Sequence, residues 1–112
     1  MSSMSARHRE MLEYLFDMQG GYLLRFTNDL FRRFMILHAD IDVYSASGYD
    51  EEPSKAKKFR YFLSNEPDAL VGQIILELLQ IRSAHIERMR LEDDEYIDSY
   101  SEYATEIENV AR

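Results

Sequence analysis

The sequence contains no cysteine and no tryptophan, and it has only four glycines and two prolines among its 112 residues. The absence of cysteine excludes disulfides, thiol catalysis, iron–sulfur clusters and cysteine-based zinc sites. Apart from Gly72, the few glycines and prolines fall near the expected helix ends or in the connector between helices. With 46% hydrophobic residues, the chain has enough apolar side chains for one packed core.

Long hydrophobic runs are also missing. No stretch approaches the ~20 apolar residues of a membrane span. The most apolar segment, 69–81, is interrupted by Gly72, Gln73, Glu77 and Gln80. The first residues lack the apolar centre of a secretory signal. We therefore expect a cytoplasmic protein without membrane contact.

Acidic residues outnumber basic ones, and the net charge is −8. This balance disfavours nucleic-acid backbones and favours a protein partner with a basic surface. The charge is uneven, because residues 92–108 hold eight carboxylates and no lysine or arginine. Residues 54–60, SKAKKFR, are basic instead. Charge runs of this kind most often form solvated faces.

Apolar spacing and capping residues predict helices at about 5–18, 27–38, 54–63, 65–89 and 93–111. Thr27 or Asn28 and Ser54 are expected to cap two of them, and Asn65 is expected to open the fourth in a capping box with Asp68. We therefore predict an all-α fold, a single domain over 1–112 that forms a compact bundle of four to five helices. Its predicted core consists of Phe31, Phe34, Phe59, Phe62, Leu70, Ile74, Ile75 and Leu78.

The C-terminal segment carries an apolar seam whose members are spaced four, three, four and three residues apart: Tyr96, Tyr100, Tyr103, Ile107 and Val110. We expect this helix to pack on the chain's own bundle, in a monomer, with Glu95 or Asp98 near an arginine of the 82–90 region. Its acidic face would then meet a basic partner. The predicted partner-binding residues are Tyr96, Tyr100, Tyr103, Glu95, Asp98, Glu102 and Glu106.

The basic block at 54–60 offers a second candidate site. Lysines at a helix N-terminus are disfavoured by the helix dipole, so something must offset them. The preceding Asp50, Glu51 and Glu52 are one explanation, and an acidic or phosphate-bearing partner is the other. The candidate anion contacts are Lys55, Lys57, Lys58 and Arg60.

Two further patterns partly match known sites, a calcium-binding loop and a ribonuclease motif. Residues 40–51 have acidic ends like a calcium loop, but Ser45 stands where that loop requires glycine, so we predict no metal and no cofactor. Arg33 and His38 have the arginine, four residues, histidine spacing of HEPN ribonucleases, in which histidine activates a 2′-hydroxyl. The residues between them are all apolar, so we interpret the pair as part of an ordinary core helix.

A family resemblance covers about 21–81. The segments GYLLRFTNDLFRRFM, IDVY and SKAKKFRYFLSNEPDALVGQIILELL occur in that order. The matching positions are 21–22, 26–28, Phe31, Phe34, 41–44, 54–63 and 68–72. In these the chain resembles the N-terminal domain of prokaryotic abortive-infection (AbiJ-type) anti-phage proteins. It departs from that pattern at Lys58, where arginine is more usual, and in its acidic tail.

The resemblance implies an accessory module attached to a nuclease, an ATPase or a HEPN-type effector, and it supplies no catalytic residue. Our first hypothesis is therefore a non-enzymatic interaction module, a sensor or regulator of a phage-defence protein. The alternatives are a stand-alone acidic regulator, such as an antitoxin that masks a basic toxin, and a HEPN-like ribonuclease that uses Arg33 and His38.

Overall fold

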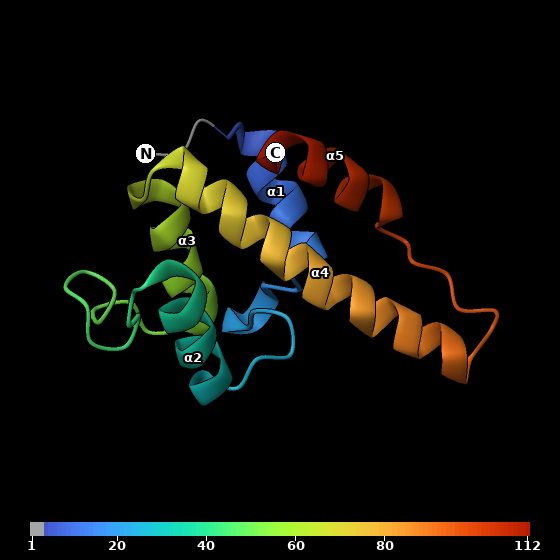
Figure 1. Ribbon diagram of the computed structural model, residues 1–112, viewed down its shortest axis with the longest axis horizontal. Coiled ribbons are helices and arrows are strands. Elements are labelled where there is room, and N and C mark those ends of the chain that lie inside the picture. The colour runs from blue at the N-terminus through green and yellow to red at the C-terminus, as the bar shows by residue number, and fades with distance from the viewer. Residues whose placement is uncertain (1–3) are drawn as a thin grey trace.

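Five α-helices and one 3-10 turn make up the fold in the computed structural model, which describes residues 4–112 and has no strand among them. Figure 1 shows their order and arrangement. The elements are α1 Ala6–Leu15, η1 Gln19–Gly21, α2 Asn28–Ala39, α3 Lys55–Asn65, α4 Asp68–Glu92 and α5 Ser101–Ala111. The predicted all-α bundle is confirmed.

Three helices begin at a hydroxyl cap, because a side-chain oxygen accepts a backbone N–H that the first turn leaves unpaired. Ser5 accepts from His8 N at 3.1 Å, Thr27 from Leu30 N at 3.1 Å, and Ser54 from Lys57 N at 3.2 Å. The predicted caps at Thr27 and Ser54 are confirmed.

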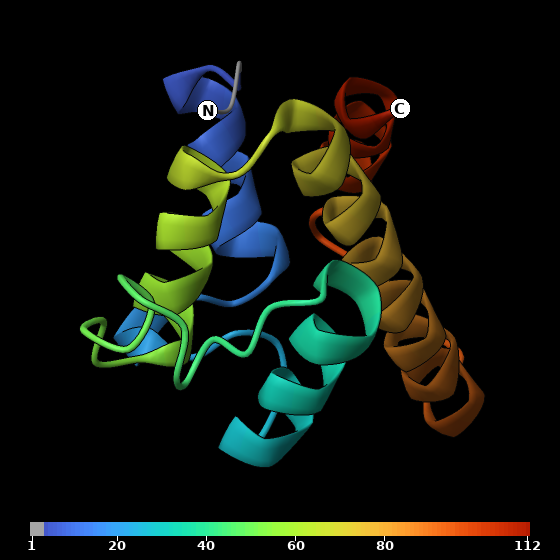
Figure 2. The ribbon, with the colours of Figure 1, turned by 60° about the vertical axis from the view of Figure 1, so that its left-hand side comes forward.

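The longest helix, α4, runs along the molecule, and its C-terminal end projects beyond α5 (Figures 1 and 2). α5 packs against both α1 and α4, and α2 packs against α4. The core lies between these helices, with Phe16 edge-on to Phe59 at a centroid distance of 6.2 Å. Its largest fully buried side chains are Leu12, Phe16, Met18, Leu23, Phe31, Met35, Phe59, Phe62, Ile74, Ile75, Leu78 and Ile107.

The predicted core is largely confirmed, with one exception. Leu70 is only partly buried, because it lies in the first turn of α4, near one end of the bundle. The predicted start of α4 is also wrong. Asn65 is the last residue of α3, where its side-chain amide donates to Tyr61 O at 2.8 Å, and Pro67 precedes the first residue of α4. The capping box therefore does not form.

The last helix is shorter than predicted, since it begins at Ser101 and not near residue 93. Two aspartates account for the difference. Asp93 Oδ1 accepts Glu95 N–H at 3.1 Å and Asp98 Oδ1 accepts Tyr100 N–H at 3.0 Å. These local bonds compete with helical ones, so residues 93–100 form a turn-rich connection.

The connector between α2 and α3 is held down by apolar and polar contacts. Val43 and Tyr49 are buried, and the Lys58 ammonium donates to Tyr49 O at 2.8 Å while lying 4.8 Å from the Tyr44 ring centre. The Tyr49 hydroxyl donates to Glu66 Oε2 at 2.8 Å, and burial raises the pKa of this phenol.

In length and composition α4 is similar to a membrane span, with a mean hydropathy of 1.2 over its most apolar window. Its apolar side chains are nevertheless used inside the bundle, where Val71, Ile74 and Leu78 are buried. One turn further on, Arg82 is buried in an ion pair. Buried apolar residues and a buried ion pair are the properties of a core helix. The expected absence of membrane contact stays a prediction.

Candidate functional site

The C-terminal segment folds back on the chain's own helices. Ile107 is fully buried between α5 and the helices beneath it. The Tyr100 ring stacks on Tyr14 of α1 at 5.7 Å between ring centres, and Tyr103 lies 6.4 Å from the same ring. The expected packing in cis is confirmed.

A buried ion pair fixes the connection that leads to α5. Arg82 Nη1 and Nη2 donate to the two carboxylate oxygens of Asp98 at 3.0 and 2.5 Å, and Arg82 Nε donates to Leu15 O at 3.2 Å. The two side chains are only 10% and 9% exposed. The hydrogen bonds from Arg82 lower the pKa of Asp98 more than its burial raises it. The prediction that Glu95 or Asp98 would lie near an arginine of 82–90 is confirmed for Asp98, whose partner is Arg82.

A second polar contact holds the middle of α5. The Arg7 guanidinium donates to both carboxylate oxygens of Glu106, and His8 Nε2 lies 3.0 Å from Glu106 Oε2. The Arg7 hydrogen bond lowers the pKa of Glu106. Glu106 is therefore engaged within the chain and does not extend freely into solvent.

Residues 91–97, which we term the acidic tip, form the far end of the molecule, where α4 turns back toward α5 (Figure 1). Leu91 is 88% exposed and Ile97 is 80% exposed. Between them the four carboxylates Glu92, Asp93, Asp94 and Glu95 are all exposed, and none forms a salt bridge within residues 4–112. The tip thus combines uncompensated negative charge with two aliphatic side chains in water.

The seven predicted partner-binding residues do not form one surface. Asp98 and Glu106 are paired in cis, and Tyr103 packs against α1. Glu95 and Glu102 are exposed. Tyr96 is half-buried, and Tyr100 is exposed at its edge while stacked on Tyr14.

Sequence reasoning overlooked Leu91 and Ile97. The signal was present, because both are aliphatic residues that flank the carboxylates of 92–95 and neither belongs to the seam of Tyr96, Tyr100 and Tyr103. Apolar residues outside a helix seam have no predicted burial partner.

The four basic residues of 54–60 are not gathered into one cationic face. Lys58 is buried with Tyr49, and Arg60 donates to both oxygens of Glu13 at 2.8 and 2.7 Å. Lys55 donates to Asn28 Oδ1 at 3.1 Å, while Lys57 is exposed. The contacts within the chain therefore account for three of the four side chains.

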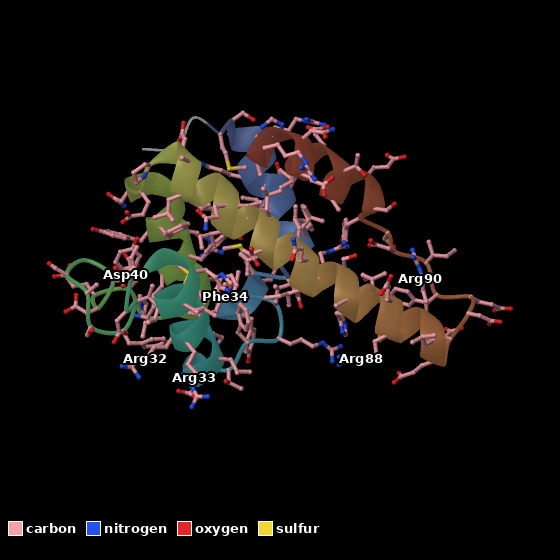
Figure 3. All side chains as sticks on the ribbon, in the orientation of Figure 1. Arg32, Arg33, Phe34, Asp40, Arg88 and Arg90 are labelled. Carbon is pink, nitrogen blue, oxygen red and sulfur yellow. The ribbon has the colours of Figure 1, made fainter. Side chains whose placement is uncertain are left out.

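Arg33 and His38 are held by different neighbours. Arg33 is 74% exposed and pairs with Asp29 at 3.1 Å, and Figure 3 shows it extending away from the bundle. The His38 ring packs on Phe34 at 4.7 Å between ring centres. Residues five positions apart on a helix point about 140° away from each other, so the two side chains diverge. Within residues 4–112 no cluster of histidines and carboxylates could hold a metal ion.

Comparisons with protein-family models, with curated proteins and with solved structures find no match to this chain. The likeness of 21–81 to the abortive-infection domain therefore stays a prediction from the sequence.

Proposed function

We propose that the chain is a non-enzymatic protein-interaction module that binds a basic partner through the acidic tip. The observation that carries this proposal is the exposure of Leu91 and Ile97, 88% and 80%, on either side of four unpaired carboxylates. Fully burying an aliphatic side chain contributes roughly 1.5–3 kcal/mol, so two of them make the tip a favourable contact. The carboxylates between them select for a basic surface.

The tip is held in a fixed position, which lowers the entropy that binding must remove. Its first residues belong to α4, and its last is followed directly by Asp98 in the ion pair with Arg82. Asp93 also fixes the turn by accepting Glu95 N–H. A partner would therefore meet an ordered surface.

The resemblance to abortive-infection domains supports a role in phage defence, with an effector protein or a fused effector domain as the partner. A stand-alone acidic regulator that masks a basic toxin would use the same surface. The two versions differ only in the identity of the basic partner. A ribonuclease would need a different site, around Arg33 and His38.

Charge removal at the tip tests this proposal. The test variant is Glu92→Gln, Asp94→Asn and Glu95→Gln, which keeps Asp93 for the turn. The control is Glu10→Gln, Asp50→Asn and Glu51→Gln, the same three changes at carboxylates that are exposed elsewhere. Both chains and the unchanged protein are used to capture partners from the source cells, with quantitative mass spectrometry as the measurement.

We expect a basic protein to be enriched by the unchanged chain and by the control, and to be lost from the test variant. A third variant, Leu91→Ser with Ile97→Ser, should reduce capture of the same partner without changing the charge of the tip. Equal capture by all the chains would contradict the proposal, as would a loss in the control alone.

A further inference from the structure

A groove separate from the acidic tip lies between residues 24–25 and the C-terminal half of α4. Its volume is about 310 Å³, at the lower end of small-molecule sites. We term it the basic groove, and its lining residues are Leu24, Arg25, Ile81, Arg82, Ala84, His85 and Arg88. Figure 3 shows Arg88 on the side of α4 that faces α2, and Arg90 on the side that faces α5.

The groove concentrates positive charge in a chain whose net charge is −8. Neither Arg25 nor Arg88 forms a salt bridge within residues 4–112, whereas Arg82 is occupied by Asp98 and Leu15 O. Two guanidinium groups therefore share the groove without a salt-bridge partner, and Glu92 is a nearby carboxylate whose charge acts on His85. Exposed like charges repel each other modestly in water, and an anion bound between them would relieve that repulsion.

The pKa of His85 is lowered by burial and by this positive charge. Burial lowers the pKa of its imidazole, and the nearby guanidinium groups of Arg25, Arg88 and Arg82 lower it further, with Glu92 acting in the opposite direction. The neutral ring has one N–H donor and one acceptor. It therefore adds a hydrogen-bond donor to the groove without adding charge.

The backbone beside Arg25 is strained. Leu24 has a φ of 49°, in the left-handed region that bulky residues rarely adopt. The conformation is held by the hydrogen bond from Leu24 N to Phe16 O at 2.6 Å and by the fully buried Leu23. Strain of this kind persists only where the surrounding structure fixes it, and it occurs often at ligand sites. Here it sets the position of Arg25 opposite α4.

We propose that the basic groove binds a small phosphate monoester that carries an aliphatic group. A phosphate monoester has a charge of about −1.5 to −2 at neutral pH, which matches the two guanidinium groups. Each guanidinium can donate two parallel hydrogen bonds to phosphate oxygens, and His85 can donate a further one.

The walls of the groove define the rest of the ligand. Leu24, Ile81 and Ala84 offer an apolar surface to its carbon chain. The lining residues include no Phe, Tyr or Trp ring on which a nucleobase would stack, which favours an aliphatic ester over a nucleotide.

NMR titration of the His85 ring tests the proposal with butyl phosphate, inorganic phosphate and butyrate as probes. We expect a saturable shift of the His85 signals and a rise in the pKa of His85. Butyl phosphate should bind more tightly than inorganic phosphate, and butyrate should bind most weakly. The His8 and His38 signals serve as internal references, since neither residue lines the groove.

Arg25→Gln and Arg88→Gln should each lower the affinity for butyl phosphate about tenfold, because each removes a charge-assisted hydrogen bond. Arg90→Gln, on the other side of α4, is the matched control and should bind as the unchanged protein does. Both tested arginines are exposed, so the variants should fold, which amide spectra can check.

Three results would overturn the proposal: no saturable shift at His85, equal affinity for the three probes, or equal weakening in Arg90→Gln. A phosphoserine peptide that bound more tightly than butyl phosphate would assign the groove to a phosphorylated protein and would overturn the choice of a small ligand. The acidic tip is unchanged in all these variants, so failure here leaves the proposed function intact.

Discussion

Arg82 and Asp98 join the C-terminal half of α4 to the connection before α5 through two parallel hydrogen bonds of 3.0 and 2.5 Å. The third donor of the guanidinium, Nε, bonds to Leu15 O at the end of α1. One arginine therefore ties together α1, α4 and the segment that follows the acidic tip. The position of the tip depends on this contact.

Removing the charge of Asp98 should destabilise the fold. Asp98→Asn leaves the guanidinium of Arg82 buried without its counter-ion, and the free energy of unfolding should fall by ~3 kcal/mol. Denaturant melts measure this loss. The control is Glu102→Gln, an exposed carboxylate in the first turn of α5, which should change stability by less than ~0.5 kcal/mol. Equal effects of the two changes would show that the ion pair is not structural.

The same contact should give stability a dependence on pH. The pKa of Asp98 is lowered in the folded chain, so its carboxylate stabilises the fold above the ordinary pKa of about 3.9. That stabilisation is lost as the pH falls through the folded value. The difference in unfolding free energy between the unchanged protein and Asp98→Asn should therefore be constant from about pH 7 to 5 and shrink below about pH 4. A difference that stays constant into acid would contradict this reading.

Gly72 gives α5 room to dock on α4. A Cβ atom at this position would lie 2.5 Å from Ala111 O, a backbone atom, so the last turn of α5 would have to shift. Gly72→Ala should therefore cost ~1–3 kcal/mol in the full chain. In a chain ending at residue 109 the same change should be neutral or should stabilise by up to ~1 kcal/mol, since alanine is the better helix former. An equal loss in both chains would refute the proposed contact.

Arg33 and His38 should have no catalytic role, because their side chains diverge and pack on Asp29 and Phe34 respectively. Purified protein incubated with single-stranded RNA should leave it intact, as followed by gel electrophoresis. Cleavage that disappears in both Arg33→Ala and His38→Ala would establish the ribonuclease instead. Lys57→Ala, at an exposed basic residue, is the control for contaminating nuclease.

Much of the fold could be predicted from local signals. Thr27 and Ser54 cap their helices because a cap depends on residues within one turn. The burial of Ile74, Ile75 and Leu78 follows from their spacing on α4. Asn65 misled the prediction because it fits the end of one helix as well as the start of the next.

The candidate sites were harder to predict because they depend on distant contacts. The start of α5 was misplaced because Asp93 and Asp98 accept nearby backbone N–H groups, and Asp98 is in addition held by Arg82, 16 residues earlier in the chain. The basic groove brings Arg25 to His85 and Arg88 through the left-handed backbone of Leu24, which no sequence pattern indicates. Only the exposure of Leu91 and Ile97 had a local signal.

Hydrogen exchange of the chain, alone and with its captured basic partner, tests the central claim most directly. If the partner binds the acidic tip, amides of residues 91–97 should exchange more slowly in the complex, while those near the exposed Leu37 on α2 stay unchanged. Protection confined to α2, with residues 91–97 exchanging at the same rate in both samples, would contradict the claim.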